Sequence, residues 1–290
     1  MAVSTLIAPL LEKLQPRAAS FIVTIYGDVV VPRGEVLWTG SLIETCERAG
    51  ISENLVRTAT SRLVSAGRLE GERIGRRSFY RLADAVRAEF ADASHLLYTT
   101  HAQPRRWFVL SQPQISAEHA RQRRMARMGG DVWLCPDWGT ETEAAIPKAA
   151  MTLEVTAPLQ VADADLLRAM WDFGDLQARY SALIETFAPT EASIAADASI
   201  SDEDALICRL LLVHAYRSVL LRDPCLPAPL LPRNWRGAEA RTFFGTLYLR
   251  LSPQADAWIG KSLVGYDGLL AARTAESDRR LRGLRDNGRG

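Results

Sequence analysis

The chain lacks the features that mark secreted, membrane-spanning and metal-binding proteins. Its 290 residues include four cysteines, and no two of them form a C-x-x-C pair. Such wide spacing predicts reduced thiols rather than disulfides or a zinc site. No run of about 20 apolar residues is without charge, as a membrane-spanning helix requires, and the first residues lack the basic start and long apolar core of a signal peptide. We therefore expect a cytoplasmic protein without a membrane segment.

Motifs of the common enzyme classes are missing as well. The sequence has no nucleophile elbow, no phosphate-binding P-loop and no dinucleotide-binding glycine motif. Its four histidines have no metal-ligand spacing with cysteine or carboxylate. His214 lies in an apolar segment and is expected to make a hydrogen bond in the core. We expect no catalytic residues, no metal and no cofactor, and hence a protein that is not an enzyme.

Lysine is scarce, and the formal net charge is only +1. Of the 35 cationic side chains, all but Lys13, Lys148 and Lys261 are arginine. Arginine suits bidentate recognition of phosphate and guanine, although genomic base composition explains such a bias equally well. Near neutrality does not exclude nucleic-acid binding, because only the local surface must be positive.

The segment 41–82 is typical of two short helices followed by a hairpin. Ser41 and Glu44 have the spacing of a capping box, which predicts a helix that begins at Ser41 and stops at Gly50. Ser52 is expected to cap a second helix that ends at about Ala66. The short connection between the two helices allows the tight bend of a helix-turn-helix.

The second predicted helix has an apolar face and a polar, cationic face. Leu55 or Val56, with Ala59 and Leu63, is expected to face inward. Apart from Glu53 at its start, the opposite face has no carboxylate to repel phosphate, and its side chains can bond base edges. Two arginines in the turn at 75–77 are placed to meet phosphate or the minor groove. The predicted DNA contacts are Ser52, Asn54, Arg57, Thr58, Ser61, Arg62, Arg73, Arg76 and Arg77. The alternative is an exposed hairpin on an enzyme, with solvated arginines.

The remaining pattern predicts an α+β protein with three domains, at 1–95, 96–172 and 173–290. Strands expected at 107–111, 131–135 and 151–156, with helices at 116–128 and 163–171, suggest a central ferredoxin-like domain. From residue 174 onward the pattern is helical. It is interrupted by a loop or weak helix at 188–201 and a proline-rich stretch at 224–232, and the charged tail after Ala275 is expected to fray.

Four segments, in order, resemble the PaaX-like family of phenylacetic-acid degradation repressors. The runs FIVTIYGDVVVPRG (21–34) and ISENLVRTATSRLVSAGRLEGERIGRRSFYRL (51–82) resemble its N-terminal domain. RQRRMARMGGDVWLCPDW (121–138) resembles its central ferredoxin-like domain, and LVHAYRSVLLRDPCLPAPLLPRNWRG (212–237) its C-terminal helical domain. The resemblance implies a winged helix-turn-helix with 52–66 as recognition helix and 75–77 as wing.

The same resemblance implies a homodimer that binds palindromic double-stranded operator DNA and represses an aromatic-acid (phenylacetate) catabolic operon. It also implies an aryl-CoA ester, phenylacetyl-CoA, as the effector that releases DNA. An acyl-CoA-responsive regulator of a different pathway is one alternative. A ferredoxin-like metal nuclease, which would need carboxylates at a strand end, is another. A third is a small-molecule-binding protein whose winged helix contacts proteins.

An arginine cluster in the central segment is a candidate anion site. Arg105, Arg106, Arg121 and Arg124 have only Glu118 nearby as a counter-charge, so the cluster is able to bind the phosphates of coenzyme A or of flanking DNA. Trp107 and Trp133 are candidates for contact with an aromatic acyl group. The competing interpretations are a solvated helix face with salt bridges, and tryptophans buried in an ordinary core.

Overall fold

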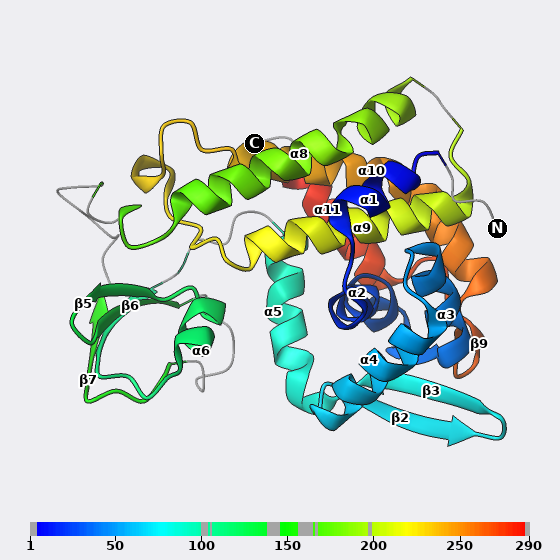
Figure 1. Ribbon diagram of the computed structural model, residues 1–290, viewed down its shortest axis with the longest axis horizontal. Coiled ribbons are helices and arrows are strands. Elements are labelled where there is room, and N and C mark those ends of the chain that lie inside the picture. Colours follow the sequence, from blue (N-terminus) through cyan, green and yellow to red (C-terminus); the bar gives the residue numbers. More distant parts are fainter. Residues whose placement is uncertain are drawn as a thin grey trace. The chain divides into compact units, whose positions relative to one another are not determined.

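The structure is a computed structural model that describes residues 5–99, 104, 106–137, 146–155, 165, 168–196 and 199–287. Helices and antiparallel sheets confirm the predicted α+β class (Figure 1). Contacts group the chain into two compact units that interleave along the sequence. The first contains residues 1–100, 182–217 and 239–290, and the second contains 101–181 and 218–238. The three-way division by chain order remains a prediction.

The first unit begins with two helices, α1 (Ala8–Leu14) and α2 (Ala18–Ile25). Phe21, Ile22 and Ile25 of α2 are completely buried. A π-helical turn (Tyr26–Val30) and a 3-10 turn (Val31–Arg33) follow directly. The π-helical turn, a form that often occurs at functional positions, carries Asp28 into the core.

The helix pair and hairpin predicted from residues 41–82 are present. Helices α3 (Thr39–Arg48) and α4 (Glu53–Ser65) are followed by strands β2 (Leu69–Ile74) and β3 (Arg77–Leu82). A short strand, β1 (Val36–Trp38), completes an antiparallel sheet of order β1-β3-β2. In Figure 1 the two long strands extend as a ribbon beside α4, with which β2 is in contact.

Both capping predictions are wrong in detail. Helix α3 begins at Thr39, so Ser41 lies inside it, and the Ser41 hydroxyl accepts a hydrogen bond from the Val264 amide (3.1 Å). Ser52 does occupy the N-cap position of α4, with extended backbone, but its side chain makes no capping hydrogen bond. The Ser41 hydroxyl therefore serves a tertiary contact and not a helix cap.

The rest of the first unit is mainly helical. Its elements include 3-10 turn η3 (Asp84–Val86), α5 (Arg87–Tyr98), parts of α8 (Phe173–Ala195) and α9 (Asp202–Leu220), most of α10 (Gly237–Ser262), β8 (Val264–Gly265), β9 (Gly268–Leu269) and α11 (Ala275–Asn287). The predicted loop or weak helix at 188–201 is helical as far as Ala195, although Pro189 lies inside α8. No helix in the described part of the chain is long and apolar enough to cross a bilayer.

The predicted frayed tail is wrong, because it forms helix α11. Arg280, Leu281 and Leu284 are buried on one side of this helix. Gly283 rests against the backbone of Tyr98, where a Cβ atom would come within 2.2 Å of the Tyr98 carbonyl oxygen. The tail is charged overall, but the spacing of its buried residues lets one face dock.

A buried ionic cluster joins the N-terminal segment to the C-terminal helices. The Asp28 carboxylate accepts hydrogen bonds from the hydroxyls of Tyr98 (2.8 Å) and Tyr248 (2.7 Å) and pairs with Arg209 Nε (3.1 Å). Asp256 Oδ1 lies 2.8 Å from both Arg209 Nη1 and Arg33 Nη2. Asp28 and Arg33 belong to the FIVTIYGDVVVPRG segment, so this cluster explains why two charged residues of that segment are buried.

Burial alone would raise the pKa of the Asp28 carboxyl. The charge of Arg209 and the hydrogen bond from Tyr248, with smaller contributions from Arg280 and Tyr98, outweigh burial and hold that pKa below its usual value. Asp28 is therefore ionised inside the core, and its partners are required to keep it there.

The second unit contains an antiparallel sheet of order β5-β6-β4-β7. Its elements are β4 (Arg106–Ser111), α6 (Ala117–Gln122), β5 (Ala126–Gly129), β6 (Val132–Asp137), β7 (Met151–Val155) and the 3-10 turn η5 (Ala228–Leu230). Phe108, Leu110 and Cys135 pack with Ala120 and Met125 in its core. Of the helix predicted at 163–171, the structure describes residues 165 and 168–171, and the others lie outside the described residues.

Two sequence predictions in this unit are wrong. The basic helix expected to reach Met128 ends at Gln122, because the chain turns through left-handed Arg124 (φ 57°) and enters strand β5. Strand β6 continues through Pro136 instead of stopping there. Strand β5 pairs with β6 only as far as Leu134, so the missing proline amide leaves no bond to β5 unmade.

Candidate nucleic-acid interface

Helix α4 presents one polar face to solvent. Val56 and Leu63 are buried, with Ala59 and Thr60, on the side that faces the protein, and α4 is in contact with α2. The predicted DNA contacts on the helix are exposed on the other side; they are Asn54, Arg57, Thr58, Ser61 and Arg62, with Ser52 exposed at the N-cap. The structure therefore brings together on one surface the helix residues that the sequence pattern selected.

The arginines of this surface differ in their partners. Arg57 Nε lies 2.8 Å from Glu53 Oε1, an i,i+4 ion pair in which both side chains are about half exposed. Arg62 and Arg76 make no side-chain hydrogen bond or ion pair within the part of the chain that the structure describes. A phosphate group would meet these two guanidinium groups without displacing an existing partner, whereas Arg57 would have to exchange Glu53 for it.

The turn between β2 and β3 is tighter than the sequence predicted. Ile74 pairs with Arg77, so Gly75 and Arg76 alone form the loop. Gly75 has a φ of 61° and Arg76 has a negative φ, which fits a type II′ hairpin turn. Arg77 is part of β3, and its guanidinium carbon lies 4.9 Å from the centre of the Trp38 ring. Arg76 is therefore the one arginine in the two-residue loop, and Arg73 and Arg77 belong to the strands.

Arg73 is held close to the turn by its own chain. Its Nε donates a hydrogen bond to the Gly75 carbonyl oxygen (3.2 Å), and its side chain is exposed. The positive charge nearest the end of the hairpin is therefore that of Arg76, and Arg73 and Arg77 lie on the strands next to the turn.

Sequence reasoning missed two features of this region. It left open whether Leu55 or Val56 faces inward; Val56 does, and Leu55 is 57% exposed in the first turn of α4. It also did not find Tyr266, whose hydroxyl donates a hydrogen bond to the Glu72 carboxylate on β2. Helical periodicity places Val56 on the same face as Ala59 and Leu63, and those two positions would have excluded Leu55. No local signal in the sequence connects Tyr266 with Glu72.

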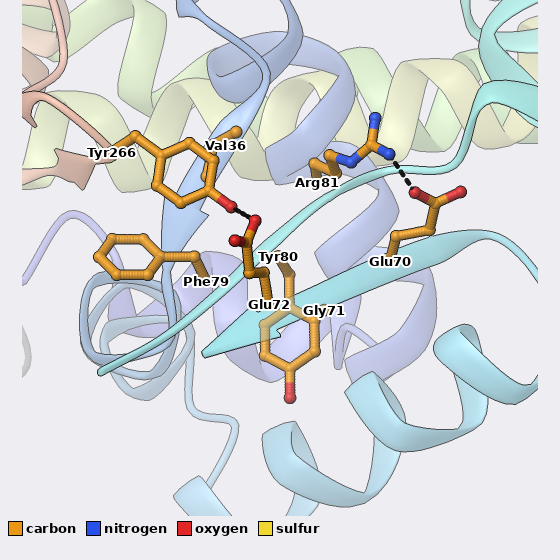
Figure 2. Close-up of a pocket in the computed structure, with 8 residues that line it drawn as sticks. All are labelled: Val36, Glu70, Gly71, Glu72, Phe79, Tyr80, Arg81 and Tyr266. Carbon is orange, nitrogen blue, oxygen red and sulfur yellow. Dashed lines mark hydrogen bonds and ion pairs between the residues drawn. The ribbon is translucent and has the colours of Figure 1, made fainter. Parts of the chain in front are cut away.

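A small pocket of about 230 Å³ lies where the β8–β9 hairpin meets the outer face of the three-stranded sheet (Figure 2). Figure 2 shows Tyr266 above Phe79, with Glu72 directed toward the Tyr266 hydroxyl and Glu70 paired with Arg81. The pocket is lined by Val36, Glu70, Gly71, Glu72, Phe79, Tyr80, Arg81 and Tyr266.

Four of the residues predicted to bind an effector have described side chains, namely Arg106, Trp107, Arg124 and Trp133, and the two tryptophans do not lie together. Arg106 pairs with Asp137 (2.8 Å) and Glu154 (3.2 Å) on neighbouring strands. By strand register, Trp107 and Trp133 lie on opposite faces of the sheet. Trp107 is buried and packs edge-on against Trp171, whereas Trp133 is half-buried beside the core cluster.

The other arginines of that set give little further information. Arg124 is buried at its left-handed turn. Arg105 lies outside the described residues, as does the side chain of Arg121. Their role toward an effector stays a prediction.

The cysteines do not provide a reactive thiolate or a metal site within the described residues. All four cysteines are buried thiols, and burial raises the pKa of Cys46 and of Cys208 to about 12 and that of Cys135 to about 11. These three are therefore protonated at neutral pH. Among the described residues, no group of three or more histidine, cysteine, aspartate or glutamate side chains is arranged to hold a metal ion.

Comparison with known proteins identifies the family. The profile described as PaaX-like protein matches residues 17–86, and that of the PaaX-like protein C-terminal domain matches residues 171–261. The transcriptional repressor PaaX of Escherichia coli (strain K12) is 32% identical in an alignment of 269 residues that covers 85% of this chain and 85% of the other. The chain belongs to the PaaX-like family. A solved structure, the uncharacterized protein Rv0674 from Mycobacterium tuberculosis, is 24% identical with a TM-score of 0.49, covering 83% of this chain and 97% of the other.

Proposed function

We propose that the protein is a DNA-binding transcriptional repressor in which α3, α4 and the sheet β1-β3-β2 form a winged helix-turn-helix. Helix α4 is the recognition helix, and β2–β3 is the wing. The observation that carries the proposal is the exposed polar face of α4, next to a wing whose tip residue, Arg76, has no partner among the described residues. Membership of a family that includes a named transcriptional repressor supports it.

The geometry suggests how the element would bind a duplex. A recognition helix contacts base edges in the major groove through its N-terminal residues, where Asn54 and Thr58 are exposed. Arg62 would meet the phosphate backbone, and Arg76 a phosphate or the adjacent minor groove. A homodimer would place two such helices about 34 Å apart on a palindromic operator.

We propose a ferredoxin-like fold for the central sheet. Strands β4 and β5 are joined through α6, and β6 lies between them in the sheet, which is the split βαβ arrangement of that fold. Only family resemblance supports an aryl-CoA or acyl-CoA effector, of which phenylacetyl-CoA is the first to test. Because a ligand shifts a conformational equilibrium only by its differential affinity, such an ester must bind the DNA-free form more tightly.

The decisive experiment selects duplexes from a randomised library with the full chain and measures affinity against salt concentration. Arg62→Ala and Arg76→Ala should each weaken binding and reduce the salt slope by about one unit, as expected for loss of a phosphate contact. Arg250→Ala, at an exposed arginine of α10 paired with Glu191, is the matched control. Failure of the wild-type chain to enrich any sequence would reject the proposal.

The effector is tested separately on the selected duplex. Phenylacetyl-CoA should release the protein, whereas free coenzyme A and phenylacetate should not. Equal DNA binding with and without a saturating concentration of the ester would reject this effector but leave DNA binding standing.

A further inference from the structure

The wing is supported at its base by a hairpin from far along the chain. The β8–β9 hairpin follows α10, and the Val264 amide at its start donates to the Ser41 hydroxyl of α3 (3.1 Å). At Gly265 the hairpin approaches β1 so closely that a Cβ atom would lie 3.2 Å from the Val36 carbonyl oxygen. The absence of a side chain at Gly265 thus lets the hairpin reach the sheet that carries the wing.

Tyr266, at the tip of this hairpin, crosses two strands of the sheet. Its ring centre lies 5.2 Å from that of Phe79 on β3, and its hydroxyl donates to the Glu72 carboxylate on β2. Figure 2 shows both contacts on the outer face of the sheet. Glu72 and Phe79 are a cross-strand pair, so one side chain holds both strands of the wing at the same level.

This level is the last at which β1 pairs with the wing through its backbone; beyond it, the Thr39 hydroxyl donates to the Ser78 carbonyl oxygen (2.7 Å) and Arg77 lies over the Trp38 ring. Strand β1 pairs with β3 only from Val36 to Trp38, and Trp38 is the partner of Phe79. Beyond it, only the pairs Arg73–Ser78 and Ile74–Arg77 continue to the Gly75–Arg76 turn. A two-stranded ribbon is marginally stable by itself, so the direction of its tip depends on how firmly its last supported pair is held.

We propose that Tyr266 is a positioning residue for the wing, through which the C-terminal segment sets the direction of Arg76 toward DNA. The inference rests on the proposed function, because it concerns the same DNA-binding surface. Tyr266 does not itself contact DNA; it restricts the ribbon before binding. Any change that moves the β8–β9 hairpin would therefore alter the contribution of the wing to DNA affinity.

The brace itself can be measured without DNA. Trypsin cleaves after Arg76 and Arg77, and appearance of the new N-termini gives the rate of opening at the tip. Tyr266→Phe, which loses only the hydroxyl, should raise this rate roughly two- to tenfold, the range expected for one hydrogen bond. Glu72→Gln keeps an acceptor oxygen and should stay near the wild-type rate.

Tyr80→Phe is the matched control. Tyr80 lies on the opposite face of β3, and its hydroxyl makes no hydrogen bond to any residue that the structure describes. Removal of the Tyr80 hydroxyl deletes the same kind of atom as Tyr266→Phe does, but from a side chain that does not brace the ribbon, and should leave the cleavage rate unchanged. Tyr266→Ala, which also loses the Phe79 contact, should exceed Tyr266→Phe. Unchanged cleavage in both Tyr266 variants would overturn the brace, and Tyr266→Phe alone decides the matter if Tyr266→Ala misfolds.

A double-mutant cycle tests whether the brace acts through the tip. On the selected duplex, Tyr266→Phe should weaken binding roughly two- to tenfold when Arg76 is present and have no effect in an Arg76→Ala background. An equal loss in both backgrounds would overturn the proposed positioning role. If Tyr266→Phe is cleaved faster but the wild-type chain binds no duplex, the proposed function is rejected and the brace stands. The two failures are therefore distinguishable.

Discussion

His214 is expected to make the stability of the first unit depend on pH. The side chain is mostly buried on α9, where its ring meets Phe21 edge-on at 5.7 Å and its Nδ1 lies 3.1 Å from Thr24 Oγ1. The Thr24 hydroxyl donates its hydrogen to the Ser20 carbonyl oxygen, so it accepts one from Nδ1. Nδ1 therefore carries a proton, as it does in one neutral tautomer and in the charged imidazolium.

The size of the effect follows from the pKa of this histidine. Burial, with the nearby charge of Arg217, lowers the pKa of His214 from 6.5 to about 4. Well above pH 6.5 the imidazole is neutral in both states, and His214 causes no loss of stability. As pH falls from 6.5 toward 4, the unfolded chain takes up a proton that the folded chain refuses. The total loss is about 3 kcal/mol, of which about 2 kcal/mol is lost by about pH 5.

Thermal unfolding followed by circular dichroism at about pH 8 and about pH 5 measures this loss. A change of about 2 kcal/mol corresponds to a Tm lower by about 4–8 °C at the acid pH. His214→Asn keeps a hydrogen-bonding atom near the Nδ1 position but cannot titrate. It should have a lower Tm at both values, because it loses the Phe21 contact, and a much smaller difference between them. His95→Gln, at an exposed histidine of α5, is the control and should retain the wild-type pH dependence.

Two results would refute the reasoning. A wild-type Tm that is equal at the two pH values would mean that His214 is not kept neutral by burial. A His214→Asn protein with the full wild-type pH dependence would assign the titration to another group.

Two further predictions concern the core and the DNA surface. Asp28→Asn removes one of the two carboxylates that pair with Arg209 and leaves Asp256 shared between Arg209 and Arg33. Breaking this buried pair should cost about 3–5 kcal/mol, a fall in Tm of roughly 10 °C. Asp84→Asn, at an exposed and ion-paired aspartate, should change Tm little, and a similarly small change for Asp28→Asn would contradict an ionised core residue. Leu55 should pack on a thymine methyl group, so Leu55→Ala, or deoxyuridine at the contacted thymine, should each weaken binding about fourfold, or about 0.8 kcal/mol per methyl-sized contact. Additive losses when the two changes are combined would show that they do not report one contact.

The sequence predicted the helix pair and hairpin well because their ends are locally determined. Gly50, Gly67 and Gly75 have φ values of 78°, 64° and 61°, and each stands where a helix or strand stops. A glycine at such a position is a signal that needs no knowledge of the rest of the chain. The alternation of buried and exposed residues on α4 likewise follows from helical period alone.

The errors lie where distant contacts decide. Strand β5 has four residues and follows a left-handed arginine, so its existence depends on pairing with β6 rather than on its own pattern. In α11, Arg280 appeared to belong to a charged, fraying tail, yet its Nη1 donates to the Gly27 carbonyl oxygen at 2.7 Å. The brace between Tyr266 and Glu72 joins residues 194 positions apart. Local periodicity does not encode contacts of this kind.

The buried ionic cluster limits where a regulatory change can take place in the first unit. Parting the π-helical turn Tyr26–Val30 from α9 and α10 would expose or unpair Asp28, Arg209 and Asp256. Breaking one buried pair costs about 3–5 kcal/mol. An effector with a differential affinity of typically 1–3 kcal/mol cannot supply that. Within this unit, exposed contacts cost less free energy to break, and the hydrogen bond from Tyr266 to Glu72 is one of them. We therefore expect regulation of this unit to act on the direction of the wing while the cluster stays closed. If the proposed effector acts on this unit, the tryptic cleavage rate at Arg76 is the quantity that should respond.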